Sequence, residues 1–291
     1  MDRRGFLGWA AAPLLSRRAW GQEEPPVDFV CPMDRDVRER GPGKCPRCGM
    51  ALVANLPDAV EYLLEVRTAP RLVRPGREVT FEFAVRDPRT RKPVREFEVM
   101  HEKLFHLFVI SQDLQFFAHE HPAPLADGRF RFRTVLPKAG EYRLACDFFP
   151  KGGTPQFLTR TIFTAGSGLA EGPRLEADVG PKRGVNLSAE LTMEPAEALA
   201  GLETLFFLKV SPREGLETYL GAWAHLLAAS DDLIDVVHDH PLYTYLDQSE
   251  RPQIQFNLLF PRERMYRVWV QFQRLGVVNT VAFNVPVKAL R

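Results

Sequence analysis

The sequence predicts an all-β protein in which a small metal-knuckle module precedes two duplicated immunoglobulin-like β-sandwich domains. Short stretches alternate apolar and polar residues, as half-buried strands do. Turn-forming clusters separate these stretches, and the 291-residue chain contains 24 Pro. A histidine motif also recurs about 120 residues later, a period that suits a whole domain rather than a solenoid unit.

Composition and charge exclude some functions. The chain has 38 Lys and Arg against 37 Asp and Glu, so its formal net charge is only +1. A nucleic-acid-binding protein would carry a basic excess, so nucleic acid is not an expected partner. Apolar residues at 45% and charged residues at 26% are ordinary globular values.

Residues 1–21 are predicted to be an export signal, followed by a linker over 22–28. The signal combines paired arginines, a short apolar run to Leu15 and a small-x-small ending, with cleavage expected after Gly21. Residues 3–7 resemble the twin-arginine type of signal, although Asp2 replaces the usual Ser or Thr. An ordinary signal peptide is the alternative. Either signal predicts a periplasmic or otherwise exported protein.

Losing the signal changes the charge of the mature chain. Residues 1–21 contain four Arg and one Asp, a net of +3, so their removal leaves −2. No other stretch holds about eighteen uninterrupted apolar residues, so no membrane span is expected.

Residues 29–57 are predicted to be the metal-knuckle module. Its Cys-Pro-x-Cys-Gly motif puts two thiolates on one tight turn, where Gly49 can take the positive φ that turns backbone N–H groups toward sulfur. A Gly-Pro-Gly turn at 41–43 can fold a third cysteine back toward that pair. So short a segment cannot bury enough core to fold alone, and a metal would supply the stability. The candidate ligands are Cys31, Cys45 and Cys48, with Met33, Asp34 or Met50 as the fourth.

The segment from Phe29 to Leu56 resembles the heavy-metal-binding domain appended to copper and silver efflux ATPases and membrane-fusion proteins. The shared residues are Cys-Pro-Met and then Gly-Pro-Gly-Lys-Cys-Pro-x-Cys-Gly-Met. The family usually continues Cys-Pro-Met-His-Pro, whereas this chain has Asp34 and Arg35. The resemblance implies a heavy-metal ion. Thiolates with Met favour Cu(I) or Ag(I), and an Asp ligand would favour Zn(II), the next candidate. A structural zinc site, a redox dithiol or a disulfide are the alternatives.

The two β domains are read from an internal repeat. Residues 106–122 match 225–241 at a constant offset of 119, and downstream matches continue at an offset of 124. The expected boundaries are 58–165 for copy 1, 166–173 for a linker and 174–291 for copy 2. Strand-like stretches such as 79–86 and 141–148 alternate in polarity, which predicts an immunoglobulin-like sandwich in each copy.

The repeat also assigns the fourth cysteine. Cys146 lies among apolar neighbours and corresponds to Val270 in copy 2. A position that accepts Val needs only a small buried hydrophobe, so Cys146 is predicted to be inert core.

Each copy contributes three matched histidines on a predicted hairpin. If Gln112 and Asp113 form a two-residue loop, His106 faces His119 directly, and residues two apart on a strand share a face. Three imidazoles on one face could hold Cu or Zn. These candidate second and third sites comprise His106, His119 and His121 in copy 1, and His225, His238 and His240 in copy 2.

Two interpretations of the triads stay open. The neighbouring residues are so apolar that both hairpin faces are expected to be buried, and the histidines could then be structural features inherited by both copies. His101, which corresponds to Leu220, is a weaker candidate. The segment from Met100 to Leu107 resembles exported all-β domains of the YtkA-like kind, which are often encoded near metal-handling proteins.

The sequence therefore favours an exported metal-binding protein that sequesters or hands on a soft ion, with Cu(I) ahead of Zn(II). A metal-efflux or other envelope protein is the expected partner. The alternative is an envelope interaction module of two immunoglobulin-like domains with a purely structural zinc knuckle. No nucleophile elbow, phosphate loop or dinucleotide fingerprint occurs in the chain, so an enzyme is not expected.

Overall fold

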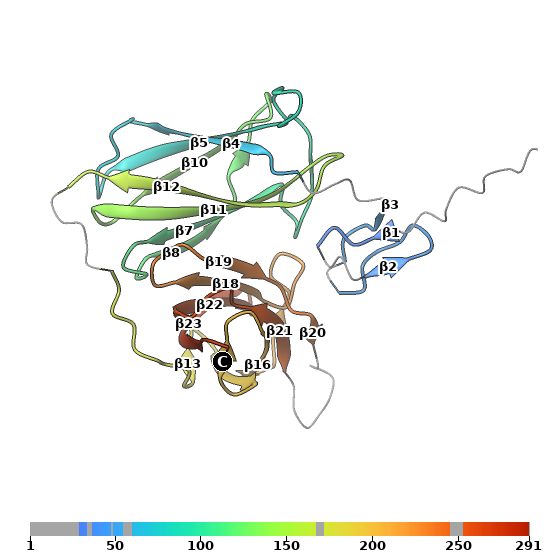
Figure 1. Ribbon diagram of the computed structural model, residues 1–291, viewed down its shortest axis with the longest axis vertical. Coiled ribbons are helices and arrows are strands. Elements are labelled where there is room, and N and C mark those ends of the chain that lie inside the picture. The colour runs from blue at the N-terminus through green and yellow to red at the C-terminus, as the bar shows by residue number, and fades with distance from the viewer. Residues whose placement is uncertain are drawn as a thin grey trace, which may run out of the picture.

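The computed structural model describes residues 29–33, 37–47, 49–54, 60–166, 172–244 and 253–290. The predicted signal and linker over 1–28, the candidate ligands Asp34 and Cys48, and most of the predicted linker at 166–173 lie outside this part. All regular elements in the described part are strands, grouped into a small module and two larger β units (Figure 1). Within these ranges, no helix is long and apolar enough to span a membrane.

The metal-knuckle module is a three-stranded antiparallel sheet of order β2-β1-β3. Its strands are only two residues long, so hydrogen bonds outside the ladder also tie it together, such as Cys31 N–H to the Val37 carbonyl at 3.0 Å. The strands are β1 (Phe29–Val30), β2 (Arg38–Glu39) and β3 (Val53–Ala54).

Copy 1 is a sandwich of two sheets, ordered β4-β5-β10-β9 and β12-β11-β7-β8, with β6 paired to β11. Alternate residues of β5 are buried, as the alternating sequence predicted. The strands are β4 (Leu63–Ala69), β5 (Glu78–Arg86), β6 (Phe97–Glu98), β7 (Phe105–Ser111), β8 (Phe117–Glu120), β9 (Ala123–Pro124), β10 (Phe130–Val135), β11 (Gly140–Pro150) and β12 (Gln156–Thr164).

Copy 2 repeats this plan, with sheets ordered β13-β14-β16-β21-β20 and β15-β23-β22-β18-β19, and with β17 paired to β22. Among the strands described in copy 2, only the short β15 runs parallel to its neighbour. The strands are β13 (Lys182–Arg183), β14 (Ser188–Glu194), β15 (Ala198–Leu199), β16 (Glu203–Ser211), β17 (Leu216–Glu217), β18 (His225–Ser230), β19 (Val236–Asp239), β20 (Tyr243–Thr244), β21 (Ile254–Leu259), β22 (Met265–Arg274) and β23 (Val277–Lys288).

A tyrosine corner, which is typical of immunoglobulin-like sandwiches, occurs in both copies. Tyr142 donates its hydroxyl proton to the Lys138 carbonyl at 3.1 Å and accepts from the Lys138 N–H at 3.0 Å. Tyr266 has the same relation to Arg262, and its hydroxyl also lies 2.8 Å from Asp235 Oδ2. The duplication that the sequence predicted is therefore visible in local hydrogen bonding.

The hydroxyl groups of the two tyrosine corners should contribute unequally to the free energy of unfolding. Tyr266→Phe is expected to cost about 1.5–3 kcal/mol of unfolding free energy, because the lost bond reaches a charged acceptor. Tyr142→Phe, its matched control, loses only neutral partners and should cost about 0.5–1.5 kcal/mol. Urea unfolding of both variants measures the difference, and equal losses would contradict it.

The predicted two-residue hairpin loop is wrong. Ser111 N–H donates to the Phe116 carbonyl, and β7 pairs with β8 so that Phe108, not His106, stands opposite His119. The Ser111 hydroxyl contacts the Asp113 carboxylate at 2.5 Å, and this carboxylate accepts the Gln115 N–H. These side chains close a four-residue loop, which the repeated Ser and Asp also close in copy 2.

The histidines still lie on one face of the hairpin in the observed register. The register moves by two residues, an even number, so no side chain changes face. Continued past the ladder, the true register places His106 opposite His121, and His119 remains on the same side of the sheet.

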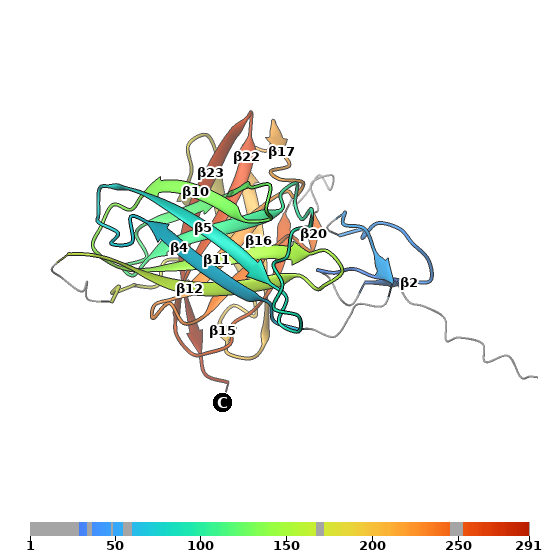
Figure 2. The same ribbon diagram turned by 90° about the horizontal axis from the view of Figure 1, so that it is seen from above.

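The two copies pack against each other through the sheets that carry the histidines (Figure 1). Seen from above, the strands of copy 1 cross those of copy 2 (Figure 2). Every residue of β7 and β18 is buried, since one face enters its own sandwich core and the other enters the contact. Burial of both faces is thus confirmed for the first strand of each hairpin, whereas β8 and β19 are mostly half-buried. The apolar interface cluster between the copies comprises Phe108, Ile110, Leu114, Ala145, Leu227, Ala229, Leu233 and Trp269.

Candidate metal centres

The metal-knuckle module brings two of its predicted ligands together. Cys31 and Cys45 are both buried and share one small cluster, against which Met33 packs. Gly49 has the expected positive φ, 73°, and its N–H donates to the Cys45 carbonyl at 2.9 Å. Two buried sulfur ligands beside a thioether fit a soft metal ion.

Met50 and Cys146 lie outside the buried sulfur cluster of the module. Met50 is half-buried, and its carbonyl accepts the Cys45 N–H at 2.8 Å. Cys146, predicted to be inert, is fully buried in the core of copy 1, and burial raises the pKa of its thiol. The structure thus separates a core cysteine from the two cysteines that it describes in the module.

The first histidine triad lies where β7 and β8 meet the interface. His106 is on β7, His119 is on β8, and His121 follows β8. One ring nitrogen from each lies within 4.8 Å of the other two. The shortest of these separations, 3.1 Å, joins His106 Nδ1 to His119 Nε2.

The second triad repeats the arrangement in copy 2. His225 is on β18, His238 is on β19, and His240 follows β19. Their ring nitrogens also lie within 4.8 Å of one another. The structure therefore assembles both triads that the repeat predicted.

The two triads are neighbours, which the sequence did not predict. The ring of His225 lies 5.6 Å from that of His119 and 6.4 Å from that of His106, centroid to centroid. His101 joins the group by stacking on His240 at 3.7 Å. All seven histidines of the chain thus form one cluster between the copies, built by strands more than a hundred residues apart in sequence.

Backbone carbonyls hold one histidine of each triad. His106 Nε2 lies 2.9 Å from the Met100 carbonyl, and His225 Nε2 lies 2.8 Å from the Tyr219 carbonyl. Each carbonyl belongs to a matching tight turn, closed by Met100 with Lys103 and by Tyr219 with Ala222. The turn explains the position of His101, which follows Met100 and has a φ of 44°.

Side chains from the opposite copy hold a second histidine of each triad. His119 Nδ1 of copy 1 lies 2.7 Å from Gln271 Oε1 of copy 2. His238 Nδ1 of copy 2 lies 2.8 Å from Asp147 Oδ2 of copy 1. Sequence reasoning missed both partners. A signal was present, because Asp147 and Gln271 are equivalent at the offset of 124 and interrupt buried strands.

Burial favours the neutral form of six histidines in the cluster. Desolvation lowers the pKa of His101 to about 4 and that of His121 to about 3. The pKa values of His106, His119, His225 and His240 are also lowered by burial, and neighbouring histidines add to the effect. Neutral imidazole is the form that binds metals, and burial favours this form in these six histidines at neutral pH.

A cavity of about 480 Å³ connects the metal-knuckle module with the histidine cluster. Its wall includes Cys45 and Arg47 from the module, Trp223 from copy 2, and His101 and His240 from the cluster. Residues of the metal-knuckle module and of the histidine cluster therefore border one space.

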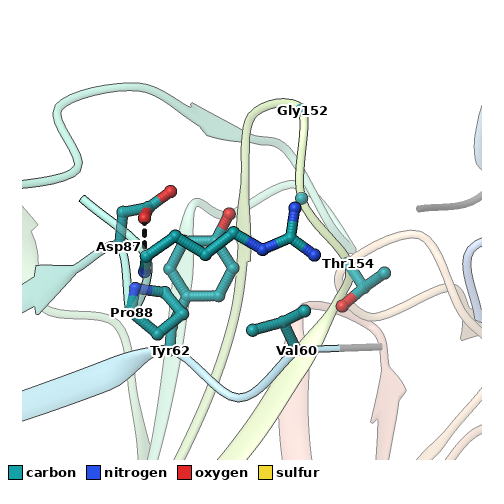
Figure 3. A pocket seen from close by; sticks show the side chains of 8 residues that line it. Val60, Tyr62, Asp87, Pro88, Gly152 and Thr154 are labelled. Atoms are coloured by element: carbon teal, nitrogen blue, oxygen red, sulfur yellow. Dashed lines mark hydrogen bonds between the residues drawn. The ribbon is translucent and has the colours of Figure 1, made fainter. Parts of the chain in front are cut away.

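A second cavity, of about 110 Å³, is formed by copy 1 alone (Figure 3). Asp87 lies on its wall, but this carboxylate accepts the backbone N–H groups of Arg89 and Thr90 at 2.8 and 2.7 Å. These bonds lower the pKa of Asp87 and commit the side chain to its own turn. The histidines do not line this cavity, which offers no comparable donor set.

Comparisons with known proteins agree with this division of the chain. The heavy metal binding domain matches residues 29–55, which confirms the predicted resemblance. A domain of unknown function, DUF8832, matches residues 59–164 and again residues 185–289. No functionally curated protein matches the chain.

Solved structures with matching folds are distant. The Escherichia coli adhesin FdeC is 12% identical, covering 81% of this chain and 68% of that one, with a TM-score of 0.26. A two-domain fibronectin type III segment of chicken tenascin is 12% identical, covering 77% and 97%, with a TM-score of 0.23. The Yersinia pseudotuberculosis adhesin InvE is 8% identical, covering 76% and 58%, with a TM-score of 0.25.

The two DUF8832 matches account for most of the chain and coincide with the two sandwiches. The chain belongs to the DUF8832 family, as a tandem of two copies that follows a heavy metal binding domain.

Proposed function

We propose that this protein is an exported metal-binding protein that captures a soft heavy-metal ion, Cu(I) in preference to Zn(II), in its metal-knuckle module. The observation that carries the proposal is the burial of Cys31 and Cys45 in one cluster inside the segment that matches the heavy metal binding domain. Cys48 completes the thiolate set, and Met33 or Met50 adds a thioether. Thiolate and thioether sulfur favour Cu(I) over harder ions.

The ion also has a structural role in this proposal. The module has two-residue strands and a core of a few side chains, too little to fold stably alone. Binding free energy would therefore act as folding free energy for the module. Capture of the ion and ordering of the module are then one event.

The cavity that Cys45 shares with His101 and His240 supports a handing-on role. An ion that leaves the thiolates would enter a space bordered by imidazoles rather than bulk water. The export signal predicted over residues 1–21 would place this exchange outside the cytoplasm, where an efflux or other envelope protein could supply or receive the ion. Binding rather than catalysis is the proposed activity.

Metal analysis of the purified mature protein tests the proposal, followed by Cu(I) titration against a competing chelator. The Cys45→Ser, Cys48→Ser double variant is expected to lose the chelator-resistant Cu(I). Cys146→Val is the matched control, because it installs the residue that copy 2 carries as Val270, and it should bind as the parent does.

Full Cu(I) stoichiometry in the double variant would refute the proposal. Tight zinc that Cu(I) never displaces would instead identify the module as a structural zinc staple, and the two sandwiches would then fit the interaction role.

A further inference from the structure

The hydrogen bonds of the first triad determine which ring nitrogens carry protons. A carbonyl oxygen only accepts, so neutral His106 must keep its proton on Nε2, facing Met100. His119 likewise keeps its proton on Nδ1, facing Gln271 Oε1. In this orientation the Gln271 Nε2 amide group donates to Thr280 Oγ1, at 3.1 Å.

This assignment leaves two lone pairs facing each other. His106 Nδ1 and His119 Nε2 are 3.1 Å apart, and neither has a proton to give. With the Gln271 oxygen facing His119, a cation between the two nitrogens makes this contact favourable. Two nitrogens bound at about 2.0–2.1 Å to one tetrahedral ion lie about 3.3 Å apart, close to the separation seen here. His121 Nε2, also buried, has no hydrogen-bond partner in the described part of the chain.

The second triad also has ring nitrogens that lack a hydrogen-bond partner in the part of the chain that the structure describes, in this case one on each of its three histidines. His225 donates to the Tyr219 carbonyl, and His238 donates to the Asp147 carboxylate. Their other nitrogens, and Nε2 of His240, are buried without a partner among the described residues. His225 is 2% exposed, and the side chain of His238 is 3% exposed.

These unpaired nitrogens separate a ligand role from a structural one. Histidines retained only for packing are expected to satisfy both ring nitrogens, because an unpaired buried polar group is destabilising. Two histidines of each triad have a bonded outer nitrogen, and the ring nitrogens of each triad converge. That is the usual design of a metal site, in which hydrogen-bond partners behind the ligands fix the tautomer and direct the lone pairs inward.

The outer partners of the two triads differ in charge. The Asp147 carboxylate supports the His238 ring, and the neutral Gln271 amide supports the His119 ring. A carboxylate makes the imidazole it contacts a stronger donor than an amide does. The triad of copy 2 should therefore bind a cation more tightly than the triad of copy 1.

We propose that the two histidine triads are two neighbouring metal sites of unequal affinity for a borderline divalent cation, Zn²⁺ or Cu²⁺, and that each exists only because the opposite copy orients one of its ligands. Three histidine nitrogens suit Zn²⁺ and Cu²⁺, whereas Cu(I) prefers sulfur ligands. The proposal does not depend on the metal-knuckle module, whose cysteines lie outside both triads.

The test uses the full mature chain carrying Cys31→Ser, Cys45→Ser and Cys48→Ser, so that a failure of the knuckle proposal cannot affect it. Zn²⁺ titration by calorimetry is expected to show two equivalents of unequal affinity. With Cu²⁺, the electron paramagnetic resonance spectrum should show coupling to several imidazole nitrogens. The spectrum should change on the second equivalent as the neighbouring ions interact.

Two variants address the orienting residues. Asp147→Asn is expected to weaken the tighter site by about 10–100-fold, and Gln271→Glu should tighten the weaker one. Glu120→Gln is the matched control, because this carboxylate lies between two ligands on the opposite face of β8; both affinities should stay at the parent values. Near-ultraviolet circular dichroism verifies that each variant is folded. If Asp147→Asn does not fold, the affinity change in Gln271→Glu alone tests the orienting role.

Fewer than two Zn²⁺ equivalents in the folded chain without the three knuckle cysteines would overturn the proposal. Unchanged affinities in both orienting variants would also overturn it, since each site would then be independent of the opposite copy.

Discussion

Lowering the pH from 7.5 to 5 is expected to unfold the metal-free protein through its buried histidines. Six of them have pKa values lowered by burial, to about 4 for His101 and about 3 for His121. In the unfolded chain histidine has a pKa of about 6.5. Below that pH the unfolded state binds more protons, so stability is complete above about pH 6.5 and falls as the pH drops toward the folded values.

The expected loss is large compared with the stability of an ordinary domain. Each proton taken up on unfolding contributes about 1.4 kcal/mol per pH unit. The four least exposed of the six would alone remove about 5 kcal/mol per pH unit, against a total stability of about 5–15 kcal/mol. These four are His101, His106, His119 and His225.

Urea unfolding between pH 7.5 and 5, with proton uptake measured by calorimetry in buffers of different ionisation enthalpy, tests this prediction. His101→Leu is the matched variant, because copy 2 carries Leu220 at the equivalent turn with a similar φ of 50°. It should take up one proton fewer on unfolding and should unfold at lower pH. A flat stability profile above pH 5 would contradict the prediction. Carboxylates with lowered pKa values, such as Asp113, titrate below this window.

Ile110→Asp is expected to destabilise the tandem by about 3–5 kcal/mol or to separate its two copies. Ile110 is fully buried and belongs to the interface cluster that both copies build. An unpaired carboxylate there would lose its hydration without gaining a partner. Since each triad is oriented by the opposite copy, separation should also abolish both proposed histidine sites while the metal-knuckle module still binds.

Chemical unfolding followed by intrinsic tryptophan fluorescence measures this effect, because Trp269 stacks on Phe117 across the interface. The expected outcome is a lower midpoint, or two transitions in place of one. Phe163→Asp is the control, because Phe163 lies on β12 of the same sheet and is 61% exposed. An equal effect of both substitutions would show that the interface cluster does not couple the copies.

Local patterns predicted much of this architecture. Alternation predicted strands such as β5, the repeat predicted two copies, and the Val270 equivalence placed Cys146 in a core. The register error arose because Ser111 and Asp113 close the hairpin by side-chain hydrogen bonds, and local composition does not distinguish that loop from a two-residue turn.

The interface between the copies was harder to predict. The continuous apolar run of β7 indicated two buried faces but not what covers the outer one. Asp147 and Gln271 act on histidines about 90 and 150 residues away. Such contacts depend on how two sandwiches dock, which no spacing within either copy encodes. The orienting residues therefore became visible only in three dimensions.

The exchange of orienting side chains between copies has a consequence for symmetry. In a two-fold dimer of identical chains, every contact occurs twice, so both orienting positions would have to hold the same residue. Joining the copies in one polypeptide removes that constraint, because positions 147 and 271 are separate codons. One position can carry a charge and the other none, and a tandem can thus hold two unlike environments where a homodimer could only repeat one.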